Sequence, residues 1–150
     1  MTDQSYDVVV VGCGPAGSMA GRSAALNGAS VLIVEKKSAI GIPNHCNECI
    51  AAPHLWEERL GFKLNPNVYS QRITKFAIVA PSGKMTPALE NDCIMVERNL
   101  FDRSLAEEAV RAGARIMLNV MATDLIMDGG AVKGLLVKRG EHEERIGAGV

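Results

Sequence analysis

Three glycines and one carboxylate near the amino end of the chain have the types and spacing of a dinucleotide-binding turn. The glycines are Gly12, Gly14 and Gly17, in the pattern G-x-G-x-x-G, and Glu35 follows Gly17 by 18 residues. Glycine has no Cβ atom, so such a turn can approach a pyrophosphate closely, and a carboxylate placed here can accept both hydroxyls of a ribose. The pattern predicts a dinucleotide site, and the negative charge of Glu35 would repel the 2′-phosphate of NADP.

The residues of the turn have separate expected tasks. Gly12 permits a tight turn, Gly14 lets the backbone approach the phosphates, and Gly17 lets a helix pack close to a strand. Pro15 suits the first turn of a helix, where its missing N–H costs nothing. The N–H groups at the start of that helix then face the phosphates, together with the positive end of the helix dipole.

These residues need a strand before the turn and a helix and a strand after it. Residues 8–11 are an unbroken β-branched run, which is typical of a parallel strand buried on both faces. A helix is expected over residues 15–28, ending at Gly28, and a second strand over residues 31–35. This order predicts a βαβ unit. The alternative is a glycine-rich turn of an α/β domain that binds nothing.

The rest of the chain alternates apolar runs with turn signals. A helix is expected over residues 99–112, with Asn99 as its N-cap and Gly113 at its end. Asp128-Gly129-Gly130 is a hairpin turn signal. The remaining expected elements are a loop over 36–53, a short helix over 53–60 that Gly61 stops, strands over 73–80, 85–89, 93–96 and 115–118, and a meander of strands over 122–127, 131–137 and 141–150.

The expected fold class is therefore α/β, a Rossmann-like FAD/NAD(P)-binding domain. It combines a parallel sheet, which contains the βαβ unit, with an antiparallel three-stranded meander. The length of 150 residues favours one domain, 1–150. Residues 146–150 are still apolar, which favours the N-terminal portion of a longer protein. The alternative is a complete small domain with a frayed last strand.

Composition narrows the classes of function. The chain has 16 basic and 17 acidic residues, and this balance gives no support for binding nucleic acid. No apolar run approaches the ~18 residues of a transmembrane helix, and the first residues lack the features of a signal peptide. We therefore expect a cytoplasmic protein, and we expect its four cysteines to be reduced thiols.

Three segments together resemble the geranylgeranyl reductase family, within the larger group of flavoproteins that includes the aromatic hydroxylases. They are residues 12–17 with Glu35, residues 40–46 (Ile-Gly-Ile-Pro-Asn-His-Cys) and residues 96–102 (Val-Glu-Arg-Asn-Leu-Phe-Asp). The resemblance covers nearly all of residues 6–150. It implies FAD as the cofactor and the saturation of isoprenoid double bonds as the reaction, in archaea on a digeranylgeranyl membrane lipid. It also implies a later FAD segment and a substrate domain, which these 150 residues do not contain.

The resemblance implies particular contacts with the cofactor. Ala16 and Gly17 would sit on the pyrophosphate, and Glu35 on the adenosine ribose. Arg98 would contact the FAD, and a bound anion would explain a cation at a helix start, although a plain surface arginine is the alternative. Ala122 would line the adenine through its backbone. The full implied set is Gly12, Gly14, Pro15, Ala16, Gly17, Glu35, Lys36, Cys46, Asn47, Cys49, Arg98 and Ala122.

The implied flavin-side loop begins at Cys46 and departs from the family pattern. The family run is Cys-Gly-Glu-Gly or Cys-Ala-Glu-Gly, whereas this chain has Cys46-Asn47-Glu48-Cys49. Three interpretations of this C-x-x-C remain open. The first is a loop beside the flavin ring, with Cys49 incidental; the second is a redox pair with a depressed thiol pKa; the third is a metal site formed with His45 and His54. No metal is expected overall.

The favoured function is an FAD-dependent oxidoreductase that reduces the double bonds of geranylgeranyl lipids. Cys46 is the candidate catalytic residue, because a thiol can donate a proton near neutral pH. The expected partners are an isoprenoid lipid, an electron donor such as NAD(P)H or a ferredoxin-like protein, and the periphery of a membrane. Two alternatives stand beside it: a monooxygenase of the aromatic hydroxylase or halogenase type, and a dinucleotide-binding module without catalysis.

Overall fold

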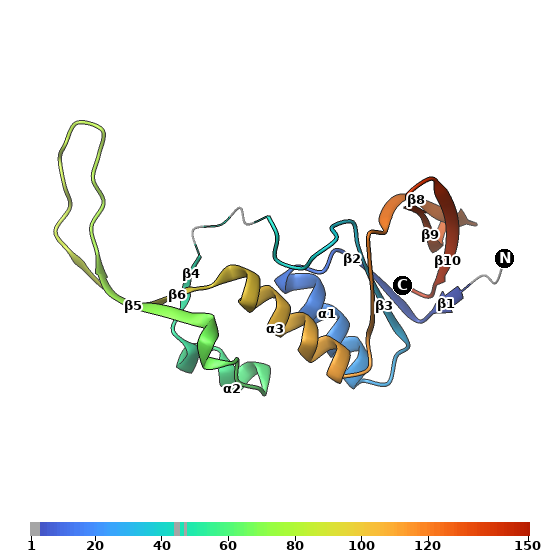
Figure 1. Cartoon of the computed structure of the whole chain (residues 1–150), viewed down its shortest axis with the longest axis horizontal. Coiled ribbons are helices and arrows are strands. Elements are labelled where there is room, and N and C mark those ends of the chain that lie inside the picture. Colours follow the sequence, from blue (N-terminus) through green and yellow to red (C-terminus); the bar gives the residue numbers. More distant parts are fainter. Residues whose placement is uncertain (1–3, 44–45, 47) are drawn as a thin grey trace. The chain divides into compact units, whose positions relative to one another are not determined.

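The computed structural model describes residues 4–43, 46 and 48–150, and it contains the βαβ unit (Figure 1). β2 (Val8–Val11) and β3 (Val31–Glu35) are parallel neighbours, joined through α1 (Pro15–Leu26). β7 (Arg115–Leu118) pairs with the other edge of β3, also in parallel. β3 is buried along its whole length because it has a neighbour on each side, which explains its continuous apolar run. The predicted parallel sheet is confirmed.

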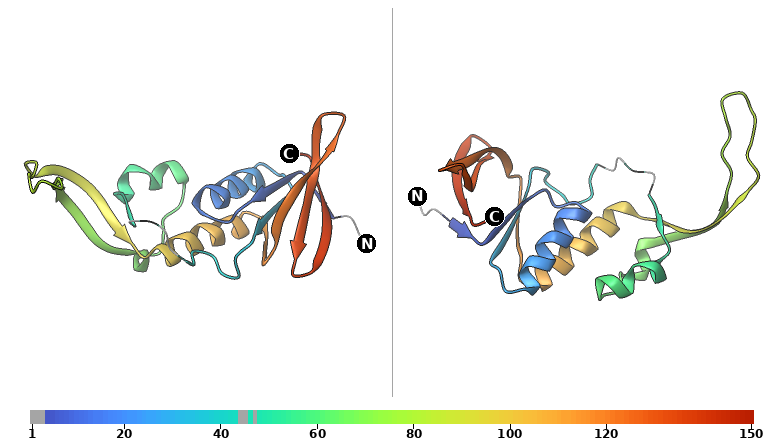
Figure 2. Two further views of the ribbon diagram at one scale, coloured as in Figure 1. Left: turned by 90° about the horizontal axis from the view of Figure 1, so that it is seen from above. Right: turned by 180° about the vertical axis from the view of Figure 1, so that it is seen from behind.

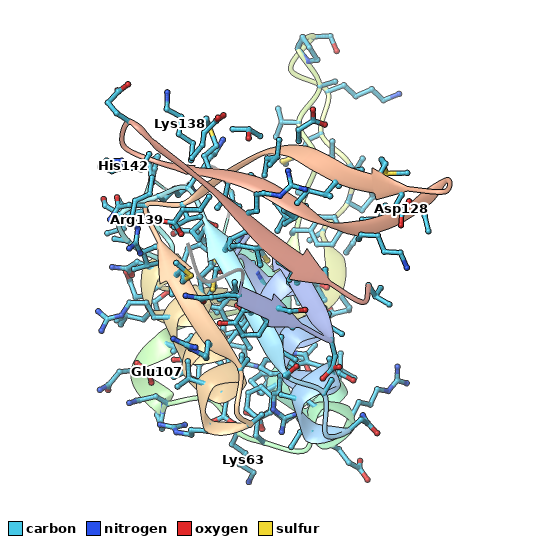
Figure 3. All side chains as sticks on the ribbon, turned by 90° about the vertical axis from the view of Figure 1, so that its right-hand side faces the viewer. Lys63, Glu107, Asp128, Lys138, Arg139 and His142 are labelled. Carbon is cyan, nitrogen blue, oxygen red and sulfur yellow. The ribbon has the colours of Figure 1, made fainter. Side chains whose placement is uncertain are left out.

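The predicted antiparallel meander is also confirmed, and its sheet contains a fourth strand that was not predicted. β8 (Met121–Asp128), β9 (Ala131–Arg139) and β10 (His142–Ala148) pair in sequence. Figure 3 shows Asp128 at one end of this sheet and Lys138, Arg139 and His142 at the other. β1 (Gln4–Tyr6) lies parallel to β10, so the sheet has the order β1-β10-β9-β8. The sequence did not predict β1, because its partner strand lies at the other end of the chain.

The described part of residues 43–101 contains a third sheet and three short helical segments (Figure 2). The sheet has the order β4-β6-β5, with β4 (Cys49–Ala51), β5 (Tyr69–Phe76) and β6 (Leu89–Val96). The predicted short helix is a 3₁₀ turn, Pro53–Leu55, followed by α2 (Glu57–Leu60); Gly61 ends it with a φ of 71°. A second 3₁₀ turn spans Pro66–Val68.

The predicted bounds of two strands were wrong. β5 begins at Tyr69 and ends at Phe76, so the apolar residues 77–80 lie outside it. They meet the returning segment through an isolated bridge between Val79 and Met85 and through backbone hydrogen bonds of Ile78 and Ala80. β6 is one strand of eight residues, where two short strands were predicted on either side of a polar run. The charged residues of that run pair with β5 across the sheet, Lys75 with Glu90 at 3.0 Å and Arg72 with Asp92 at 2.9 Å. Such cross-strand pairs place charges at exposed strand positions.

The helix that follows β6 begins one residue earlier than predicted. α3 spans Arg98–Arg111, and the N–H of Phe101 donates to the carbonyl of Glu97 at 2.8 Å. Asn99 is therefore in the first turn and is not the N-cap; its Oδ1 accepts from the N–H of Leu100. The predicted end is confirmed, since Gly113 follows with a φ of 110°.

The parallel sheet separates two hydrophobic cores. Alternate residues of a strand face opposite sides, so Leu32 and Val34 join a core with the meander, while Val31 and Ile33 join a core with α3. The chain divides into two compact units: unit 1 comprises residues 1–42 and 102–150, and unit 2 comprises residues 43–101. Within the described part of the chain, no helix is long and apolar enough to cross a membrane.

Candidate functional site

The glycine turn of unit 1 has a geometry that only glycine permits at two of its positions. Gly12 has a φ of 100°, in the left-handed region, and its N–H donates to the carbonyl of Val34 at 2.8 Å. A Cβ atom on Gly17 would lie 1.9 Å from the carbonyl oxygen of Gly12. The chain therefore makes its turn at Gly12 and brings α1 against that turn at Gly17.

Gly14 has a different reason to be glycine. A Cβ atom on Gly14 would have no neighbour within 4 Å, and its φ of −83° is open to any residue. Neither packing nor backbone strain explains this glycine, so what it preserves is open space beside the turn. That space lies at the start of α1, where the first N–H groups have no partner inside the helix.

The start of α1 is favourable for an anion. Pro15 is the first helical residue, and Gly14 precedes it as the N-cap without a side chain of its own. The N–H of Ser18 donates to the carbonyl of Gly14 at 2.9 Å and closes the first turn. The exposed N–H groups and the positive end of the helix dipole both favour a phosphate here. Ala16 and Gly17 belong to the same turn of the helix.

Glu35 ends β3 and is held by two backbone donors. Its Oε2 accepts from the N–H of Cys13 at 2.8 Å, and its Oε1 accepts from the N–H of Lys37 at 2.9 Å. The side chain is buried, with 9% of its surface exposed. Each carboxylate oxygen has a further lone pair, so the group can still accept two hydroxyl protons.

Lys36 and Ala122, two further residues predicted to bind the cofactor, also belong to unit 1. Lys36 follows Glu35 directly and is exposed. Ala122 is the second residue of β8 and packs against the meander core. β8 is brought to the end of β3 by Val120, whose N–H donates to the carbonyl of Glu35 at 3.0 Å.

The residues of unit 1 fit the adenine half of a dinucleotide. Gly14 leaves open space at a helix start that attracts phosphate, and Glu35 offers oriented acceptors for a ribose. The negative charge of the Glu35 carboxylate would repel a 2′-phosphate on the ribose. These residues therefore suit FAD or NAD better than NADP.

The flavin-side contacts predicted from the resemblance belong to unit 2. Cys46 is exposed and Cys49 is half-buried in β4, while Asn47 lies outside the described residues. Between them, Glu48 has a φ of 61°, which a residue with a side chain seldom adopts. The carbonyl of Glu48 accepts from the N–H of Val96 at 2.9 Å, so the end of this loop is tied to β6.

Burial, and then a hydrogen bond with Cys93, raise the pKa of the Cys49 thiol. A redox pair requires a depressed pKa at one of its two thiols, so the redox interpretation of the C-x-x-C stays a prediction.

The metal interpretation included His45, which lies outside the described residues. His54 contacts Asp92 over 3.6 Å, between Nε2 and Oδ2. Within the ranges that the structure describes, no group of three His, Cys, Asp or Glu side chains is placed to hold a metal ion.

Arg98 is the first residue of α3 and is half-buried in unit 2. Its guanidinium lies over the ring of Phe101, 5.9 Å from the centroid, a cation–π contact that fixes the side chain.

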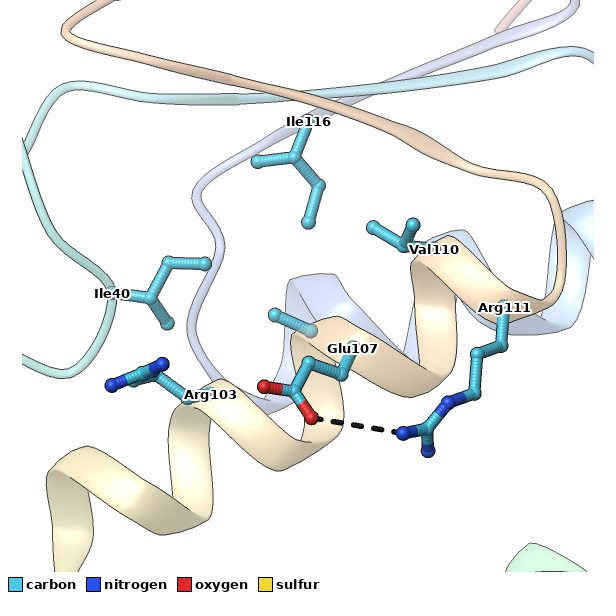
Figure 4. Close-up of a pocket in the computed structure, with 7 residues that line it drawn as sticks. Ile40, Arg103, Glu107, Val110, Arg111 and Ile116 are labelled. Carbon is cyan, nitrogen blue, oxygen red and sulfur yellow. Dashed lines mark ion pairs between the residues drawn. The ribbon is translucent and has the colours of Figure 1, made fainter.

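Sequence reasoning missed the role of the Cys13 backbone. Its N–H holds Glu35, whereas its side chain is buried and contacts Ser18. No side-chain signal could have revealed this, because the donor belongs to the backbone. A pocket on α3 was also not predicted. It measures about 400 Å³, and its lining includes Ile40, Ile116 and the ion pair of Glu107 and Arg111 on α3 (Figure 4).

Comparison with known proteins places this geometry among flavoproteins. The sequence model for FAD dependent oxidoreductases matches residues 7–150. The digeranylgeranylglycerophospholipid reductase of Methanothrix thermoacetophila is 38% identical over 138 residues, which are 89% of this chain and 34% of that protein. The chain thus spans about a third of the length of this curated relative.

Two solved structures share the fold. A geranylgeranyl bacteriochlorophyll reductase-like protein from Thermoplasma acidophilum aligns with a TM-score of 0.84 and 30% identity, over 97% of this chain and 38% of that one. A flavin-dependent brominase aligns with a TM-score of 0.71 and 25% identity, over 97% of this chain and 36% of that one.

Proposed function

This chain belongs to the family of FAD-dependent oxidoreductases, and from that membership we propose that it is the N-terminal FAD-binding portion of an enzyme that reduces the double bonds of geranylgeranyl groups on lipids. The relatives named digeranylgeranylglycerophospholipid reductase support this substrate class. The observation that carries the proposal is the pairing of Gly14, whose missing Cβ leaves open space, with the oriented carboxylate of Glu35.

The cofactor and the chain have separate tasks in this proposal. FAD, when bound, supplies the hydride chemistry. The start of α1 holds the pyrophosphate, and Glu35 accepts the ribose hydroxyls. Lys36 and Ala122 would border the adenosine, and Arg98 would contact the FAD. Cys46 would be the group that donates a proton to the alkene.

The partners and the location complete the proposal. The lipid substrate brings the enzyme to the cytoplasmic surface of a membrane. Reducing equivalents come from NAD(P)H or from a ferredoxin-like protein. Peripheral contact with lipid needs no membrane-spanning helix.

The test is made on the full-length protein, purified natively. Its visible spectrum reports bound FAD, and mass spectrometry reports co-purified polyprenyl lipid. The chemically reduced protein is then mixed with digeranylgeranylglycerophospholipid under anaerobic conditions. We expect the lipid to gain the mass of one H₂ for each double bond reduced. Bound FAD without any such gain contradicts the proposed reaction.

A monooxygenase of the halogenase type is the second candidate, because the brominase shares the fold at 25% identity. It predicts oxygen consumption by the reduced protein that an aromatic compound and halide stimulate. A purified protein without flavin contradicts both enzymes and favours a binding module.

A further inference from the structure

The pocket on α3 is formed entirely within unit 1 (Figure 4). Its residues from α3 recur at intervals of three and four, so they lie on one face of the helix: Arg103, Ala106, Glu107, Val110 and Arg111. Ile40, from the segment after β3, and Ile116, from β7, complete the lining. The pocket thus joins an apolar surface to a small number of charged side chains.

The apolar part of the pocket is accessible to a ligand. Val110 is 51% exposed, whereas its neighbour Ala109 is fully buried in the core. Ile40 and Ile116 are half-buried and pack against that same core, which holds them in place. The volume of about 400 Å³ lies within the range of ~300–1,000 Å³ in which proteins bind small molecules. An apolar chain that enters here removes Val110 from water, which is favourable.

The charged part of the pocket favours an anion. The guanidinium of Arg111 is already paired with Glu107, at 3.8 Å, and with Glu108. Among the residues that the structure describes, no carboxylate forms an ion pair with Arg103. An arginine can bind a carboxylate through two parallel N–H bonds. Arg103 therefore offers a charge and hydrogen-bond donors beside the apolar lining.

We propose that this pocket binds a small amphiphile, a medium-length alkyl chain that ends in a carboxylate. The chain lies against Ile40, Ile116 and Val110, and the carboxylate pairs with Arg103. A neutral chain would leave the charge of Arg103 unmatched, and a cationic end would be repelled by it. The inference goes beyond the proposed function, since binding here needs neither the flavin nor a double bond.

The experiment uses decanoate as the probe and the full-length protein. Titration calorimetry compares decanoate with decanol, which has the same chain length but no charge. We expect decanoate to bind at least ~10-fold more tightly, because a hydrogen bond to a charged group contributes this much. Arg103→Ala should lower the affinity for decanoate by a similar factor. The matched control Arg139→Ala removes another exposed arginine of unit 1 and should leave the affinity unchanged.

A second variant tests the apolar part. Val110→Trp places a large side chain at an exposed position of the pocket, so it should weaken the binding of decanoate and of decanol. Circular dichroism reports whether each variant folds. The comparison of the two probes on the unaltered protein stands without the variants.

A photoreactive analogue of decanoate, with a diazirine on its chain, locates the site. Trypsin cleaves after lysine and arginine, so the pocket residues that the chain would contact lie in the peptides 38–59, 104–111 and 116–133. We expect the label in these peptides and its loss in Val110→Trp.

Four results each overturn the proposal: no binding of decanoate, equal affinity for decanol, unchanged affinity in Arg103→Ala, or a label confined to other peptides. The first is also the result expected if a later part of the full-length protein covers this face of α3. Each measurement reports binding alone, so a protein that fails to reduce geranylgeranyl lipid can still pass or fail this test.

Discussion

The backbone N–H of Cys13 donates to Oε2 of Glu35 over 2.8 Å. The glycine turn and the acid that ends β3 are therefore bonded to each other before any nucleotide arrives. A second N–H, from Lys37, fixes the other carboxylate oxygen. The proposed phosphate side and ribose side of the site thus share one hydrogen-bonded connection, which would lower the entropy lost on binding.

Glu35→Gln tests this connection. The amide offers one acceptor oxygen where the carboxylate offers two, so one of the two backbone N–H groups loses its partner. We expect a loss of about 1–3 kcal/mol in the free energy of unfolding. We also expect FAD to bind about 10- to 100-fold more weakly in the full-length protein. Flavin release measured by fluorescence checks the affinity, and an unchanged affinity would separate Glu35 from the ribose.

Gly17→Ala and Gly14→Ala form a matched pair. The added Cβ would lie 1.9 Å from the Gly12 carbonyl oxygen in the first variant and would meet nothing within 4 Å in the second. We expect Gly17→Ala to lose about 1–3 kcal/mol or more of folding stability. Gly14→Ala should keep the thermal midpoint of the FAD-free protein but lose flavin. If Gly14→Ala retains flavin, the pyrophosphate does not approach this backbone.

The lowered pKa of Asp7 predicts that the folded state becomes less stable in acid. Its Oδ2 accepts from the N–H and the Oγ of Ser30, at 2.7 and 2.6 Å, and these bonds lower the pKa of Asp7 below its usual 3.8. A lowered pKa in the folded state stabilises the fold above the unfolded value, and this contribution disappears as pH falls through the folded pKa. An NMR titration of the Asp7 carboxyl group measures its pKa in the folded protein. Ser30→Ala, which keeps the N–H and removes the hydroxyl, should raise the pKa of Asp7; an unchanged titration contradicts the assignment.

The raised pKa of Tyr69, in unit 2, predicts that the folded state becomes less stable at alkaline pH. Burial, and then its hydrogen bond to Oε1 of Glu57 at 2.8 Å, raise the pKa of the phenol well above its usual 10.0. The neutral phenol stabilises the fold below pH 10, and this contribution is lost as pH rises through the folded pKa. Ultraviolet titration of phenolate detects the shift. Glu57→Gln removes the negative charge, so its tyrosine should ionise at lower pH; equal titration of both proteins would show that Glu57 has no influence.

Local patterns predicted the βαβ unit and its glycine turn well because these parts are close in sequence. The βαβ unit, the position of Glu35 and the turn at Gly12 depend on steric rules that act within 35 residues. The start of α3 was less predictable. Glu97, which precedes the helix, is not a preferred N-cap residue. Asn99, which is a preferred type, lies inside the first turn.

The bounds of the strands in unit 2 could not be predicted from local sequence, because they depend on which strands pair with each other. Residues 90–92 look like a break in an apolar pattern when they are taken alone. Arg72 and Lys75 on β5 give them partners, so the strand continues through them. The same run of sequence without β5 beside it would have no reason to stay extended.

The sequence by itself determined the fold class, the turn and the acid, because glycine conformation, β-branched burial and carboxylate charge are properties of single residues at fixed spacing. Only the tertiary structure decided that Gln4–Tyr6 joins β10, that the Cys13 backbone holds Glu35, and that Ala51 lies opposite Cys93. Those contacts join residues that are 22 or more positions apart. They depend on strand register, which forms only when a whole sheet assembles.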